Sequence, residues 1–64
     1  MDVETLVDLL RETEESHGRY EANAPEHEWP VWYGAYMSSR QQGRSSDEAF
    51  DDASAYVERQ LAGE

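Results

Sequence analysis

The sequence predicts an all-α protein, a small three-helix bundle, and three observations support this fold class. Apolar residues recur at steps of three and four through most of the chain, which is the period of an amphipathic helix. Two short segments rich in Pro, Gly, Asn and Ser divide this pattern into three parts. The chain has only 64 residues, which suits a single helical domain, 1–64. We therefore expect helices at about 3–22, 30–42 and 46–62.

The first predicted helix begins after Asp2, because an Asp side chain can accept hydrogen bonds from the free amides of a first turn. Gly18 falls inside the helical pattern, but Tyr20 keeps the period, so we expect the helix to continue to residue 22. The stripe expected to face the core runs through Val3, Leu6, Val7, Leu10, then Thr13 or Glu14, His17 and Tyr20, with Leu9 beside it.

Turn and capping residues place the other two helices. Pro25 ends the first helical pattern, and Pro30 fits the first turn of the second helix, where a missing amide proton is harmless. Gly43 is the expected left-handed residue after the second helix. Ser45 and Glu48 form the sequence pattern of a capping box, which predicts the start of the third helix. The apolar side of that helix carries Ala49, Phe50, Ala53, Tyr56, Val57 and Leu61.

Acidic residues dominate the charged positions. The chain has 15 Asp and Glu residues against five Arg, no Lys, and a formal net charge of −10. The acids alternate with apolar residues at helical spacing and do not form a tail. In molar salt the Debye length falls to about 3 Å, which screens the self-repulsion of such a surface. The composition favours halophilic adaptation; an acidic protein from a high-GC genome and a DNA-mimic inhibitor are the alternatives.

Charge and hydropathy also exclude several classes of function. A strongly negative chain repels phosphates, so we expect no nucleic-acid partner. The apolar runs are too short to span a membrane, and no signal-peptide pattern opens the chain, so we expect a cytoplasmic protein without membrane contact. The absence of cysteine removes disulfides and thiolate metal sites.

The small size of the chain predicts association. Domains of this length rarely build a core that is stable by itself, and many oligomerise or bind a partner. We therefore expect a homodimer, or a complex with another protein, rather than a free monomer.

Aromatic residues are concentrated in the middle of the chain, and we expect them to form one interaction cluster. In a chain poor in Leu and Ile these large rings must supply much of the core, although they could also face a partner or a flat ligand. Arg40 is expected to pair with an acid of another helix or to stack on a ring. The predicted cluster consists of Tyr20, Trp29, Trp32, Tyr33, Tyr36 and Arg40.

The two histidines suggest a metal site as the alternative to a structural role. Glu14, His17 and Glu21 share one helix face, and His27 follows in the next loop. Neutral imidazole suits zinc or iron, so His17, Glu21 and His27 are the candidate ligands. In the structural interpretation, which we favour, His17 bonds a carboxylate and His27 caps or orients the loop; no metal and no cofactor is then required.

Catalysis finds little support in the sequence. The chain contains no cysteine, no Gly-x-Ser-x-Gly motif and no phosphate-binding glycine loop. Carboxylates are so numerous that no pair stands out. We expect no enzymatic activity and no catalytic residue.

The segments HGRYE, PEHEWPVWY and RQQGRSSDEA, with Tyr36 between the last two, resemble a set of short prokaryotic proteins. Those proteins carry the patterns HG-x-[YF]-E and HDWxxWY and are often labelled bleomycin-resistance-like or glyoxalase-associated. Glu28 replaces the usual aspartate, and Pro30 stands where an aromatic residue is frequent. The resemblance implies that one connected cluster is formed by His17, Glu21, His27, Trp29, Trp32, Tyr33, Tyr36 and Arg40.

Two functions follow as expectations. The first is a non-enzymatic, salt-adapted accessory module that makes protein–protein interactions through its aromatic face. The alternative is a module that binds a metal or a small molecule, such as a bleomycin-like drug, around His17, Glu21 and His27.

Overall fold

The computed structural model describes residues 2–63, and these residues confirm the all-α fold class. They form α1 (Val3–Glu21), α2 (Trp29–Gln41) and α3 (Ser46–Leu61), with no strand in this part of the chain. Each predicted boundary lies within one residue of the observed one. Within the same range no helix is long and apolar enough to cross a membrane.

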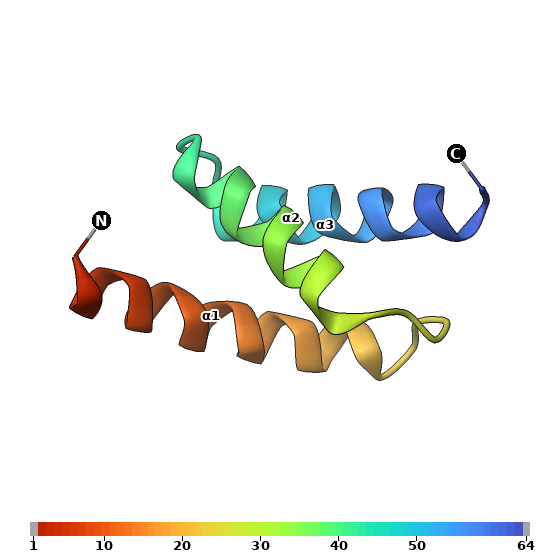
Figure 1. Ribbon diagram of the computed structural model, residues 1–64, viewed down its shortest axis with the longest axis horizontal. Helices are drawn as coiled ribbons and strands as arrows, with labels where there is room; N and C mark the ends of the chain where they lie inside the picture. The colour runs from red at the N-terminus through yellow and green to blue at the C-terminus, as the bar shows by residue number, and fades with distance from the viewer. Residues whose placement is uncertain (1, 64) are drawn as a thin grey trace.

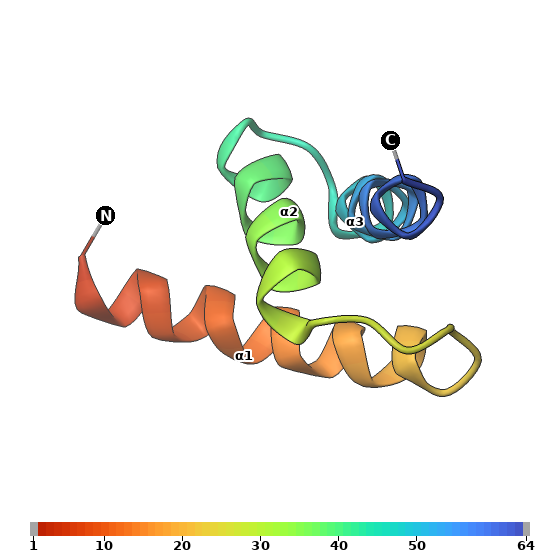
Figure 2. The same cartoon turned by 45° about the vertical axis from the view of Figure 1, so that its right-hand side comes forward.

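The three helices are arranged as a hairpin with one helix laid across it. Figure 1 shows α2 between the other two helices, and in Figure 2 α3 is seen end-on while α1 runs below α2. The α2–α3 interface is the more extensive of the two large helix contacts, and α1 packs mainly against α2. The first turns of α1 extend beyond α2, and the molecule measures 35 × 21 × 18 Å.

Local side-chain chemistry fixes the helix ends as predicted. Asp2 Oδ1 accepts the Thr5 amide at 2.8 Å and caps α1. Gly43 has φ 89°, and the Arg44 amide donates to the Ser39 carbonyl at 3.3 Å, which is the Schellman arrangement after α2. At the start of α3, the reciprocal bonds of the capping box between Ser45 and Glu48 are both formed. These predictions were correct because each depends on a few neighbouring residues.

The core lies where α2 meets α3 and the C-terminal half of α1. Trp32 and Tyr36 of α2 are completely buried and stack with 5.3 Å between ring centroids. Tyr20 of α1 also stacks on Trp32, with 5.5 Å between the ring centroids. On α3, small residues allow α2 to approach closely; the fully or almost fully buried ones are Ala49, Ala53 and Val57.

The predicted burial of the first half of α1 was wrong. Val3 is 76 % exposed, Leu6 39 %, Val7 36 % and Leu10 41 %, and we call these four residues the open stripe. The helical period of apolar residues is present in α1. The first turns of α1 nevertheless extend beyond the part of the helix that packs against α2, so these side chains lie outside the core. Two apolar residues of α3 are also exposed, Tyr56 at 42 % and Leu61 at 52 %.

Candidate functional site

The predicted aromatic cluster is connected, but the structure divides it between core and surface. Trp32 and Tyr36 are fully buried, and Tyr20 is 8 % exposed. Tyr33 is half-buried and Trp29 is 60 % exposed; their rings meet edge to face at 5.0 Å. Trp29 opens α2 and precedes the turn that enters the core, so its side chain lies at the rim of the molecule. The buried rings are therefore structural, and the exposed ring is accessible to a partner or a ligand.

The two histidines lie against each other beside these rings. His17 of α1 and His27 of the α1–α2 loop face each other with 2.9 Å between their Nε2 atoms. His27 Nδ1 lies 2.9 Å from the Pro25 carbonyl oxygen, which can only accept a hydrogen bond. In the neutral pair, His27 therefore carries its proton on Nδ1, and His17 Nε2–H donates to His27 Nε2. The prediction that His17 bonds a carboxylate was wrong, whereas the prediction that His27 orients the loop was correct.

The electrostatic environment of this pair is set mainly by burial. Burial lowers the pKa of His17 below its ordinary value of 6.5, the Glu21 carboxylate raises it, and the neighbouring His27 lowers it. Burial raises the pKa of the nearby Tyr33 phenol, and the charges of Glu14 and Glu21 act in the same direction. His17 is thus held in its neutral form within a surrounding of negative charge.

Only two of the three predicted metal ligands come together. His17 and His27 converge through their Nε2 atoms, but Glu21 does not complete a ligand set. Within residues 2–63 there is no group of three or more His, Cys, Asp or Glu side chains placed to hold a metal ion.

A shallow groove of about 600 Å³ runs beside the pair, between α1 and the first turns of α2. Its walls combine aliphatic side chains of the open stripe, an aromatic rim and two acids. The lining consists of Val7, Leu10, Arg11, Glu14, His17, Glu21, Trp29 and Tyr33. The groove therefore offers apolar contact together with attraction for positive charge.

A larger cavity of about 810 Å³ lies along α2 and α3, away from the histidines. It is lined in part by Gly34, Ala35 and Ser38, and it contains neither histidine and neither tryptophan. Its size results from small side chains on the outer face of α2. We therefore assign the candidate site to the smaller groove, where aromatic, acidic and imidazole groups meet.

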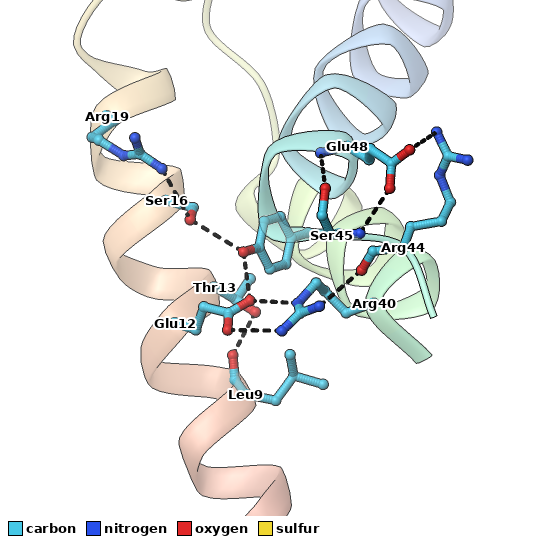
Figure 3. Close-up of polar contacts among 10 residues, drawn as sticks. Leu9, Glu12, Thr13, Ser16, Arg19, Arg40, Arg44, Ser45 and Glu48 are labelled. Carbon is cyan, nitrogen blue, oxygen red and sulfur yellow. Dashed lines mark hydrogen bonds and ion pairs between the residues drawn. The ribbon is translucent and has the colours of Figure 1, made fainter. Parts of the chain in front are cut away.

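Arg40 makes the ionic contact that its position predicted, and the structure identifies the acid as Glu12 (Figure 3). Arg40 Nε and Nη2 donate to the two Glu12 carboxylate oxygens at 2.8 and 3.3 Å. The Tyr36 hydroxyl donates to the same carboxylate at 2.6 Å. The Arg40 hydrogen bonds lower the pKa of Glu12, although burial acts against them. Stacking on a ring, the alternative expected for Arg40, is made by Arg19, whose guanidinium carbon lies 5.4 Å from the centre of the Phe50 ring.

Three polar contacts that tie the helices together were missed at the sequence level. Asp52 of α3 accepts from Ser39 at 2.7 Å and from Arg44 Nε at 2.6 Å. The Tyr20 hydroxyl donates to Glu58 at 3.2 Å. The helical period places Asp52 and Glu58 on α3, but nothing in the sequence distinguishes them from the other acids among the 15 as partners of another helix.

No protein-family model matches the sequence, and neither a curated protein nor a solved structure matches it, so the resemblance described above stays a prediction from the residues.

Proposed function

We propose that this chain is a small non-enzymatic interaction module that self-associates through the open stripe of α1. The observation that carries the proposal is the exposure of four consecutive stripe residues on one helix face, all of which the periodic pattern marks as core positions. Apolar residues with helical period on a solvent-exposed face are typical of a surface that packs against another helix.

A second copy of the chain is the partner that fits this face best. An antiparallel pairing of two α1 helices, centred between Leu6 and Val7, places Val3 opposite the partner's Leu10. The same pairing brings Arg11 to the first turn of the partner helix, which carries Asp2 and Glu4. Opposite charges then flank an apolar centre, which favours this register over a parallel one.

The area required is modest. The smallest stable interfaces bury about 600 Å² per partner, roughly one eighth of the 4513 Å² surface of this chain. The open stripe and the rim residue Trp29 provide a contiguous starting surface for such a contact. Association of two chains of formal charge −10 requires screening, so we propose that the dimer forms in a salt-rich cytoplasm.

Sedimentation velocity at several protein concentrations, in 0.1 M and in molar KCl, tests the proposal. We expect a dimer whose fraction increases with salt, and a monomer for Leu6→Gln/Leu10→Gln. Leu61→Gln is the matched control, because Leu61 is similarly exposed but lies on α3. A concentration-independent monomer in molar KCl, or equal dimer fractions for the double variant and the control, contradicts the proposal.

The groove beside α1 supports a second candidate function, the binding of a flat cationic molecule such as a bleomycin-like drug. Glu14 and Glu21 provide negative charge, and Trp29 provides a ring that can stack on a ligand. Because Trp32 is fully buried, quenching of tryptophan fluorescence on addition of bleomycin would report mainly on Trp29. This candidate requires saturable quenching that is lost in Glu14→Gln/Glu21→Gln; unsaturable quenching contradicts it.

A further inference from the structure

We propose that His17 and His27 form a binding site for a divalent transition-metal ion, such as Cu²⁺ or Zn²⁺, coordinated by the Nε2 atoms of both imidazoles. The inference does not require self-association, because neither histidine belongs to the open stripe; the groove beside His17 does share Val7 and Leu10 with that stripe. It rests on the orientation of the two rings, on the hydrogen bond that fixes one of them, and on access to the pair from solvent.

The orientation of His27 is that of a metal ligand. Its Nδ1–H donates to the Pro25 carbonyl at 2.9 Å, which leaves the Nε2 lone pair directed at His17. Histidine ligands in metal sites generally donate their second ring proton to a backbone carbonyl or a carboxylate in this manner. The hydrogen bond to the loop therefore selects the tautomer of the neutral imidazole in which Nε2 is free to bind a metal.

The separation of the two nitrogens is close to that of a bound pair. The Nε2 atoms lie 2.9 Å apart, whereas two ligands at 2.0–2.1 Å from a tetrahedral ion are separated by about 3.3 Å. To replace the shared proton by a metal, the nitrogens must move apart by a few tenths of an ångström, and both rings must turn so that their lone pairs meet at a point beside the line that joins the nitrogens. His17 then moves its proton from Nε2 to Nδ1, so both imidazoles remain neutral and no proton is released.

The remaining coordination positions can be filled from solvent. His17 and Glu21 line the groove of about 600 Å³, and His27 and Glu21 line an adjoining cavity of about 610 Å³. Each imidazole thus borders one of these two hollows, and Glu21 lines both of them. The proposed site has two protein nitrogen ligands, and within residues 2–63 no third His, Cys, Asp or Glu side chain completes a ligand group.

Nitrogen ligands distinguish this site from the many carboxylates of the surface. We would add one equivalent of Cu²⁺ to the protein in molar KCl with excess Mg²⁺, which occupies sites that offer only oxygen ligands. Electron paramagnetic resonance then counts the nitrogens bound to copper, and calorimetry with Zn²⁺ under the same conditions gives the affinity. The variants are His17→Ala and His27→Ala, and the matched control is Glu26→Gln, an exposed acid of the same loop.

We expect two coupled nitrogens in the natural sequence and in Glu26→Gln, and a loss of Zn²⁺ affinity of at least tenfold in either histidine variant. Circular dichroism verifies the fold of each variant. If the buried His17 proves necessary for folding, the half-buried His27 decides the question alone. A copper signal without two nitrogen couplings, or a His27→Ala variant that binds Zn²⁺ as the natural sequence does, overturns the proposal.

Discussion

Glu12→Gln tests whether one carboxylate holds α1 against α2. The side chain keeps its size but loses its charge, so the two Arg40 hydrogen bonds and the 2.6 Å bond from the Tyr36 hydroxyl lose their ionic component. They join α1 to the C-terminal half of α2, beside a longer bond of 3.4 Å that the Ser16 hydroxyl of α1 donates to the Tyr36 hydroxyl (Figure 3).

The size of the expected loss in the free energy of unfolding depends on how exposed the Glu12 and Arg40 side chains are. A hydrogen bond to a charged group contributes about 1.5–3 kcal/mol when it is well buried. The Arg40 and Glu12 side chains are 33 % and 34 % exposed, so solvent screening reduces this value. We expect a loss of about 1.5 kcal/mol in the free energy of unfolding, or roughly 6–12 °C in Tm for a domain of this size.

Thermal unfolding followed by circular dichroism, in molar KCl and at one fixed protein concentration, measures this loss. Glu15→Gln is the matched control, because Glu15 is an exposed acid of α1 with no hydrogen bond or ion pair among residues 2–63. Both substitutions remove one negative charge, so their difference isolates the contacts of Glu12. Equal Tm values for the two variants would refute the assigned role.

The pH dependence of the same variant provides a second check. Arg40 holds the pKa of Glu12 below its ordinary value of 4.5 in the folded protein. A carboxylate with a lowered pKa stabilises the fold above its unfolded pKa and loses this contribution as the pH falls through the folded value. The Tm difference between the natural sequence and Glu12→Gln should therefore be constant above about pH 5.5 and shrink as the pH falls below 4.5.

Three further predictions concern local features of the fold. Gly18→Ala should stabilise the protein by about 1 kcal/mol, because Gly18 is helical and an added Cβ meets nothing within 4 Å. Gly43→Ala should destabilise the protein by about 1 kcal/mol, because Gly43 has φ 89°. Urea unfolding of both variants measures these two changes of opposite sign. Ser45→Ala removes the N-cap of α3 and should cost about 1 kcal/mol in the same assay, with Ser46→Ala as a control at the neighbouring position. Because burial lowers the pKa of His17, its contribution to stability is present above pH 6.5 and is lost as the pH falls below that value; in His17→Gln, the fall in Tm between pH 7 and pH 5 should be smaller than in the natural sequence.

The helices and their ends could be predicted because they depend on local chemistry. A capping Asp2, a left-handed Gly43 and the pair Ser45 and Glu48 each act within one turn of the chain. Their positions in the sequence are therefore sufficient to locate the helix boundaries within one residue. The continuing period also predicted that the first helix does not end at Gly18, and the structure confirms this.

Burial could be predicted only in part, because it depends on where helices cross. The stripe of α1 has one uninterrupted period, yet Tyr20 lies in the core whereas Val3 and Leu10 are exposed. Nothing in the period marks the point at which α2 ends its contact with α1. The contact between the two histidines could not be predicted from the helical period either, because it depends on the path of the loop that brings His27 against His17.

The division of the aromatic cluster determines which substitutions can report on function. Trp32 is completely buried and touches rings from α1 and α3, so its replacement by Ala should cost about 3–5 kcal/mol and compromise folding itself. Such a variant would lose association and ligand binding together, whatever the function. Trp29 is 60 % exposed, and its replacement leaves the core intact. An effect of Trp29→Ala on sedimentation or on ligand binding would therefore reflect the surface directly, which makes the exposed tryptophan, and not the buried one, the informative position.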